Sequence, residues 1–137
     1  MMLVTTSRDP SAKARRLGKA LASFLSVPYA NRGKQSLIED ETWLVVVEDH
    51  GNPRGLVKRS HGKEEQMAFK VAQEPPMVRL KRRRPVVTGA ERDALPVARF
   101  FELDWREGPA SELRTLLVAF GQIDFVDEGI VRFRLKI

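Results

Sequence analysis

Thr5-Thr6-Ser7-Arg8-Asp9-Pro10-Ser11 divides a short apolar run at residues 2–4 from a segment with helical spacing. The apolar run predicts a first strand. Ser7 or Asp9 can cap the following helix, because a side-chain oxygen accepts a hydrogen bond from a free backbone N–H. Pro10 suits the first turn, where its missing N–H would be unpaired in any case. The stretch therefore predicts a strand, a turn and a helix over residues 10–25.

The predicted helix has two unlike faces. Its apolar residues recur at helical spacing, and they are Ala14, Leu17, Leu21, Phe24 and Leu25. Arg15, Arg16 and Lys19 fall on the opposite side. One face can dock on a core while the other presents cations, and such a surface suits a phosphate backbone. The alternative is an ordinary solvated helix face.

The turn before this helix is a second candidate anion site. Ser7 and Arg8 stand between a strand and a helix N-terminus, where free N–H groups and the helix dipole favour negative charge. The alternative is simple capping, since Ser and Thr cap helices routinely.

Two more segments carry candidate contacts to RNA. Asn31-Arg32-Gly33-Lys34 combines two cations and an amide with a glycine, which lets another backbone approach closely. Tyr29 lies beside it and is the best candidate for base stacking. Lys81-Arg82-Arg83-Arg84 is the densest charge run, and such runs bind RNA, acidic partners or nothing. The predicted RNA contacts are Ser7, Arg8, Arg15, Arg16, Lys19, Asn31, Arg32, Lys34, Lys81, Arg82, Arg83 and Arg84. We expect Arg8, Arg15, Arg16, Arg32 and Lys34 to form one positive surface.

The charge is unevenly distributed along the chain. The 137 residues carry a formal net charge of +6, with 24 Lys and Arg against 18 Asp and Glu. Residues 1–84 hold 17 cations against 9 acids, and residues 85–137 hold 7 against 9. The first part therefore has a net charge of +8 and the second −2. This segregation indicates an anionic partner, and nucleic acid is the obvious one.

Composition excludes several classes of protein. An apolar fraction of 42% can build a core, so global disorder is not expected. The chain has no stretch that is long and apolar enough to span a membrane. Its N-terminus also lacks the pattern of a signal peptide. The absence of cysteine excludes disulfides and thiolate metal sites. We therefore expect a cytoplasmic protein without a membrane partner.

Enzymatic signatures are weak. The two histidines, His50 and His61, both fall in or near predicted loops, so a zinc site is not expected. No residues converge as a nucleophile, an acid or a base. The sequence thus predicts no catalytic residues, no metal, no cofactor and no small-molecule substrate.

The remaining patterns predict a mixed fold. Residues 43–47 and 56–59 form a hairpin, and residues 67–72 a strand. Residues 85–96 are irregular and 97–103 a strand. Residues 110–120 form a helix, with apolar positions at Leu113, Leu116, Leu117 and Phe120 and with Gly121 at its end. Residues 123–126 and 130–137 close the chain as a hairpin. The predicted fold class is α/β, with α+β layers of helices on a sheet.

Several segments resemble the Brix-domain family of ribosome-biogenesis proteins. TTSRDPS, the basic helix and NRGK are similar to the opening of that family. WLVVVEDHGNPRGLVKRSHG at 43–62, MAFKVAQEPPMVRLK at 67–81 and IDFVDEGIVRFRLKI at 123–137 resemble later strands and hairpins. One departure is that Ser60-His61 continues into Gly62-Lys63-Glu64, where many members have Gly-Pro-Thr. The chain is short for the family and looks like its compact archaeal form.

The resemblance implies a fold and a function. The expected architecture is one Brix domain over residues 1–137, with similar halves at about 1–64 and 65–137. Each half would place a helix on strands and resemble the anticodon-binding domain fold of class II aminoacyl-tRNA synthetases. The implied function is a non-catalytic rRNA-binding factor in pre-rRNA processing and ribosomal subunit assembly. Its partners would be ribosomal RNA or pre-rRNA and other assembly proteins. The alternatives are a protein-interaction scaffold module within pre-ribosomal complexes and a tRNA-binding accessory domain.

Overall fold

The first half of the chain forms a four-stranded sheet with one helix. The structure is a computed structural model that describes residues 1–31, 40–109 and 112–137. The sheet has the order β1-β2-β3-β4, in which β1 and β2 are parallel and the other neighbours antiparallel. Its elements are β1 (Met2–Thr6), α1 (Ala12–Leu25), β2 (Thr42–Asp49), β3 (Asn52–Ser60) and β4 (Lys63–Ala68).

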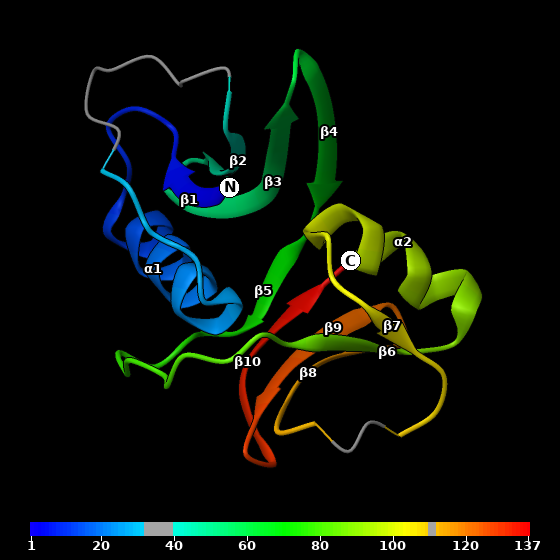
Figure 1. The fold of residues 1–137 in the computed structure, drawn as a ribbon. Helices are drawn as coiled ribbons and strands as arrows, with labels where there is room; N and C mark the ends of the chain where they lie inside the picture. Colours follow the sequence, from blue (N-terminus) through cyan, green and yellow to red (C-terminus); the bar gives the residue numbers. More distant parts are fainter. Residues whose placement is uncertain (32–39, 110–111) are drawn as a thin grey trace.

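The second half forms a six-stranded sheet with the other helix (Figure 1). The strand order is β5-β10-β9-β8-β6-β7, in which β6 is parallel to β7 and β8. The elements are β5 (Lys70–Gln73), β6 (Val86–Gly89), α2 (Glu91–Phe101), β7 (Trp105–Arg106), β8 (Arg114–Ala119), β9 (Gln122–Asp127) and β10 (Ile130–Lys136). The chain passes from the first sheet to the second at Phe69.

The same order of elements occurs in both halves. A strand, a helix, a parallel strand and two antiparallel strands appear as β1-α1-β2-β3-β4 and again as β6-α2-β8-β9-β10. The predicted mixed α/β fold of helices on sheets is confirmed. Each of the two-residue hairpin turns has positive φ at both positions, which matches the twist of the flanking strands. These turns are His50-Gly51, His61-Gly62, Phe120-Gly121 and Glu128-Gly129.

The end of α1 packs against the second sheet. Phe24 meets Phe125 and Phe133 edge-on, with ring centroids 5.2 and 6.0 Å away. Phe125 and Phe133 stack on each other at 4.1 Å. All three are at most 1% exposed, so this aromatic cluster joins α1 of the first half to β9 and β10 of the second.

The N-terminal predictions hold except for the helix cap. β1, α1 and the β2–β3 hairpin lie where the sequence predicts them. The cap is Ser11, and neither Ser7 nor Asp9, because the Ser11 hydroxyl accepts a hydrogen bond from the Ala14 N–H at 3.1 Å. Asp9 is in the left-handed region with φ 52°, and Pro10 precedes the cap. The predicted strand at 67–72 is divided by Phe69 into β4 and β5.

Three C-terminal predictions are wrong. Residues 110–120 contain the strand β8 and no described helix; residues 97–103 lie mostly in α2; and residues 85–96 hold β6 and the start of α2. Burial of β8 alternates, since Leu116 and Val118 are buried whereas Leu117 is 42% exposed. Gly121 has the positive φ that its sequence position suggests, but it closes a hairpin. The final hairpin is confirmed as β9–β10.

Gly89 at the end of β6 allows this strand to lie close to β8. Its φ is +134°, and an added Cβ would overlap the Val118 carbonyl oxygen. We expect Gly89→Ala to lower the free energy of unfolding by more than the roughly 1–3 kcal/mol of backbone strain alone. Urea unfolding measures this loss, and Gly62→Ala is the control, because nothing lies near a Cβ there although φ is +78°. An equal loss in both variants would contradict the role of the close contact.

Candidate nucleic-acid interface

A cationic groove follows the outer face of α1. It has a volume of about 1050 Å³ and lies between α1, residues 28–31 and residues 76–82. Its lining includes no Asp or Glu among the described residues. It includes five cations, which are Arg15, Arg16, Lys19, Arg79 and Arg82. Segments far apart in the sequence therefore bring positive charge to one concave surface.

The α1 wall holds the cations that the helical spacing predicts. Arg15 is exposed and its Nη2 donates a weak 3.4 Å hydrogen bond to the Pro10 carbonyl. The Nε of Arg16 is buried with no hydrogen-bond partner. The Lys19 ammonium stands 5.9 Å from the centroid of the Tyr29 ring. None of the three forms an ion pair with a described acidic side chain, so their charge is available to an anion.

The wall of the groove opposite α1 is formed by residues 76–82, which are irregular chain. This segment is hydrogen-bonded to the end of α1. The Leu80 N–H donates to Ser23 Oγ at 3.0 Å, and the Arg83 N–H donates to Ser26 Oγ at 2.8 Å. The Ser26 hydroxyl in turn donates to the Arg83 carbonyl at 2.6 Å. Figure 1 shows this connection between β5 and β6 passing the C-terminal end of α1. The two serines thus fix the backbone on either side of Arg82.

The run 81–84 does not act as one patch. Lys81 and Arg82 are exposed, and Arg82 lines the groove. Arg83 instead pairs with Glu128 at 3.0 Å and approaches Asp127 at 3.7 Å. Arg84 donates to the carbonyl oxygen of Glu102 at 2.8 Å, at the end of α2. Half of the run therefore has structural partners within the chain.

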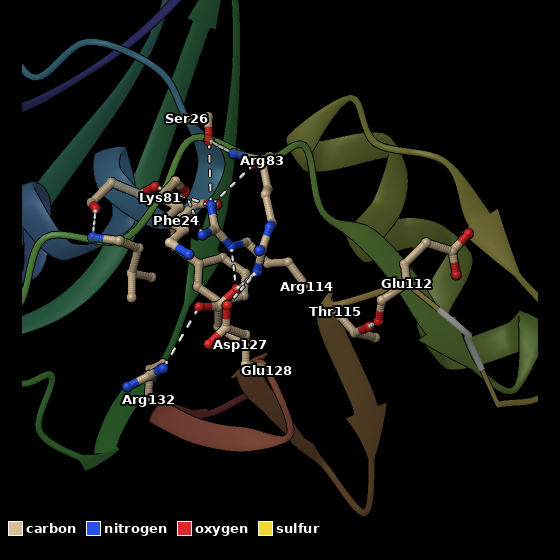
Figure 2. A network of polar contacts seen from close by, with 12 residues as sticks. Phe24, Ser26, Lys81, Arg83, Glu112, Arg114, Thr115, Asp127, Glu128 and Arg132 are labelled. Atoms are coloured by element: carbon tan, nitrogen blue, oxygen red, sulfur yellow. Dashed lines mark hydrogen bonds and ion pairs between the residues drawn. The ribbon is translucent and has the colours of Figure 1, made fainter.

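Arg114 is the centre of a polar network between the end of α1 and residues 81–83 (Figure 2). Its side chain is fully buried, and its Nε donates to Asp127 Oδ1 at 2.9 Å. Its Nη1 donates to the carbonyls of Phe24 and Arg83, both at 3.1 Å. Its Nη2 donates to the Lys81 carbonyl at 2.6 Å. One side chain from β8 therefore binds the end of α1 and the groove wall together.

The N-terminus of α1 already carries an anion from the chain itself. Glu48 accepts hydrogen bonds from the Ser11 backbone N–H at 3.2 and 3.3 Å and from the Ser11 hydroxyl at 2.5 Å. Ser7 donates its backbone N–H to the Val46 carbonyl, and Arg8 is exposed. Neither Ser7 nor Arg8 lines the groove. The sequence did not indicate that Glu48 would take this position.

The groove collects part of the predicted set. Arg15, Arg16, Lys19, Asn31 and Arg82 line it. Arg32 and Lys34 lie outside the described residues, so their place on the same surface stays a prediction. Arg8 does not join the groove, because it stands before the N-terminus of α1.

Sequence reasoning missed Arg79 and Arg114. Arg79 stands close before the run 81–84, and its proximity to that run was the available signal. Arg114 occupies an inward position of a strand on which Leu116 and Val118 are also buried. A charged residue in such an alternation indicates a buried partner, but the helix prediction for residues 110–120 concealed the alternation.

Cations on the second sheet are mostly neutralised within the chain. Arg134 donates to Asp124 at 2.5 Å, and this hydrogen bond raises the pKa of its guanidinium above the usual value. Arg132 lies at a bulge in β10 and reaches towards Asp127 at 3.7 Å. The groove cations therefore differ from the arginines of β8 and β10, which have acidic partners within the chain.

The described residues offer little for other chemistry. They contain no cluster of three or more His, Asp or Glu side chains that could hold a metal ion. Neither described helix has the length and hydropathy that a membrane span requires.

Relatives identify the family. No family model matches the chain. A probable Brix domain-containing ribosomal biogenesis protein of Methanosarcina mazei is 33% identical and aligns with 99% of this chain and 96% of its own. A protein of the same name from Methanococcoides burtonii is 43% identical over 70 residues, 46% of this chain and 45% of its own. The chain therefore belongs to the family of Brix domain-containing ribosomal biogenesis proteins, as its N-terminal motifs predicted.

Two solved structures share the fold. The crystal structure of Mil, an archaeal Imp4-like protein, is similar with a TM-score of 0.83 and 25% identity. The match covers 100% of this chain and 96% of Mil. A probable ribosomal biogenesis protein of Aeropyrum pernix K1 shares the fold, with a TM-score of 0.66 and 18% identity over 98% of this chain and 92% of that one.

Proposed function

We propose that the chain is a non-catalytic rRNA-binding factor of ribosome biogenesis that holds RNA phosphates in the groove along α1. The observation that carries this proposal is the set of five groove cations without a lining acid among the described residues. Family membership supports a setting in ribosome biogenesis. The role proposed within it is pre-rRNA processing and ribosomal subunit assembly in the cytoplasm. Ribosomal RNA or pre-rRNA is the proposed ligand, and other assembly proteins are proposed partners.

The chemistry of the groove suits phosphate contacts more than base reading. Arginine presents a planar fork of donors and lysine a point charge, and both bind phosphate oxygens. Such contacts position a protein on nucleic acid without reading its sequence. Tyr29 already packs against the core and under Lys19, so stacking on bases is not central to the proposal. We propose Asn31, Arg32, Lys34 and Lys81 as neighbours that extend the surface.

Removing the α1 cations tests the proposal. We expect the triple variant Arg15→Ala, Arg16→Ala, Lys19→Ala to bind rRNA fragments more weakly while the helix persists, because alanine is the best helix former. If each residue contacts one phosphate, the slope of log K against log salt concentration should fall by about 2–3. The measurement is a binding titration at several salt concentrations, with thermal melting to show that the variant is folded.

A matched variant removes the same charge elsewhere. Arg54, Lys63 and Arg99 are exposed and lie outside the groove, so their replacement by alanine should leave the salt slope near the wild-type value. If both triple variants lose the same slope, overall charge controls binding and the groove is not the site. If neither loses slope, RNA binds elsewhere.

One observation favours a protein ligand as the second candidate. The groove wall also exposes apolar side chains, with Met77 82% and Val78 55% exposed. An acidic and apolar segment of another assembly factor would satisfy both charge and hydrophobicity. Such docking depends less steeply on salt than phosphate binding does. Crosslinking in cells and sequencing of the attached RNA would separate rRNA binding from this scaffold role and from a tRNA-binding accessory role.

A further inference from the structure

Arg114 links the two walls of the groove without being exposed to it. The residue is 1% exposed, and it is not among the groove-lining residues. Its guanidinium binds the carbonyls of Lys81 and Arg83, the two neighbours of Arg82 in the chain. The same guanidinium binds the carbonyl of Phe24 in the last turn of α1. The wall that carries Arg82 and the helix that carries Arg15 therefore share one anchor.

The anchor also satisfies an electrostatic need of α1. The C-terminal carbonyls of a helix carry partial negative charge and favour a cation. The last turn of α1 contains no basic residue of its own. Arg114 supplies that cation from β8, and the buried carboxylate of Asp127 balances its charge at 2.9 Å. A fork-shaped guanidinium can reach all these acceptors at once, whereas a lysine ammonium is a single point charge.

We propose that Arg114 is a positioning residue for RNA binding, which sets where Arg79 and Arg82 stand relative to the α1 cations. This inference rests on the proposed function, since it presupposes that the groove holds phosphates. Arg114 acts through the backbone of residues 80–83 and contacts no RNA itself. Without the hydrogen bonds from Arg114, residues 80–83 are no longer held in place. Arg79 and Arg82 then no longer contact the phosphates that α1 binds.

The other half offers a matched control. Lys58 is 7% exposed and pairs at 3.0 Å with Glu102, the C-cap of α2, while its ammonium donates to the Arg99 carbonyl at 3.3 Å. It stands 5.9 Å from the Phe100 ring, as Arg114 stands 5.4 Å from the Phe24 ring. Each ring belongs to a residue two positions before a left-handed C-cap. Lys58 is therefore the corresponding buried cation at a helix end, remote from the groove.

The test compares Arg114→Lys with Lys58→Met in binding titrations of an rRNA fragment. Arg114→Lys keeps the charge beside Asp127 but lacks the fork, so we expect the salt slope to fall by about 1.4–1.8, equivalent to two phosphate contacts. Lys58→Met should keep the wild-type slope. In a background of Arg79→Ala and Arg82→Ala, Arg114→Lys should cause no further fall. Circular dichroism shows whether each variant is folded.

Amide hydrogen exchange gives a second readout of the same effect. The Leu80 and Arg83 amides should exchange faster in Arg114→Lys and at the wild-type rate in Lys58→Met. If Arg114→Lys fails to fold, Ser23→Ala with Ser26→Gly replaces it. That pair removes the hydroxyl contacts to the wall, and glycine suits the left-handed C-cap, where φ is 58°. The same loss of slope is expected.

The outcomes distinguish the positioning role of Arg114 from the proposed RNA-binding function of the groove. A wild-type slope in Arg114→Lys, together with a reduced slope in Arg79→Ala, Arg82→Ala, overturns the positioning role and leaves the proposed function standing. An equal loss in Lys58→Met also overturns it, because any buried cation would then matter. A wild-type slope in Arg79→Ala, Arg82→Ala overturns it as well, since the wall would hold no phosphate. The α1 triple variant and its matched control decide the proposed function, independently of Arg114.

Discussion

Arg114→Ala is expected to cause the largest loss of stability of any single change at this site, about 3–5 kcal/mol. The side chain binds Asp127, which is 3% exposed, and removal of one partner leaves a buried charge without its main counterion. Several backbone carbonyls lose a donor at the same time. Since natural domains have about 5–15 kcal/mol in total, much of the stability would be lost.

Thermal and urea unfolding measure this effect. The melting temperature should fall by roughly 10–20 °C. A double variant, Arg114→Leu with Asp127→Leu, is the informative companion, because an ion pair replaced by apolar residues is often nearly neutral. Here we expect only partial recovery, since the carbonyls of Phe24, Lys81 and Arg83 remain without their donor. Full recovery would show that the Asp127 pair alone explains the cost.

The N-terminal half could be predicted from sequence because its signals are local. The apolar stripe of α1 and its opposite cations depend only on helical spacing. The two-residue turn at His50-Gly51 lies between strands whose composition is clear. These elements would be recognised in isolation, so tertiary context adds little to them.

Residues 110–120 were predicted wrongly because the spacing of their apolar residues also fits a helix. Leu113, Leu116, Leu117 and Phe120 fit a helix, yet Phe120 is 99% exposed at a hairpin turn. β8 is a strand because it pairs in parallel with β6, a contact between distant segments. Such tertiary pairing overrides local propensity.

The adjacent helix was missed for a different reason. α2 has helical spacing at Ala94, Val97, Ala98 and Phe101, but Pro96 lies within it. Proline usually ends or bends a helix, so a helix that contains one is hard to recognise from its sequence. Pro96 is exposed, and the buried stripe on the other side holds the helix against the sheet.

The groove itself was only half predictable. Its α1 wall follows from helical periodicity, whereas its second wall depends on Ser23 and Ser26 binding a segment more than fifty residues away. Serines at the end of a helix normally indicate capping, and no local pattern shows which distant backbone they hold. Arg79 and Arg82 could therefore be identified as cations but not placed opposite α1.

Replacement of all five groove cations is expected to have the largest effect on function. The variant carries alanine at Arg15, Arg16, Lys19, Arg79 and Arg82, and it should lower the salt slope by about 3.5–4.5 if each residue contacts one phosphate. Raising salt fourfold would then weaken the variant about 100- to 500-fold less than the wild type. The loss should be the same for RNAs of unrelated sequence, because phosphate contacts carry no base information.

Titration of the five-residue variant must be compared with a variant of equal charge. Alanine at Arg54, Lys63, Lys70, Arg92 and Arg99 removes five exposed cations outside the groove, so both variants fall from a formal net charge of +6 to +1. Long-range attraction depends on net charge and is the same for both, whereas direct phosphate contacts depend on position. A steep slope that persists in the groove variant would show that RNA is held elsewhere. A slope that vanishes equally in the control would show that RNA is held by diffuse charge. A slope lost only from the groove variant would locate the phosphates between α1 and the wall that Arg114 anchors.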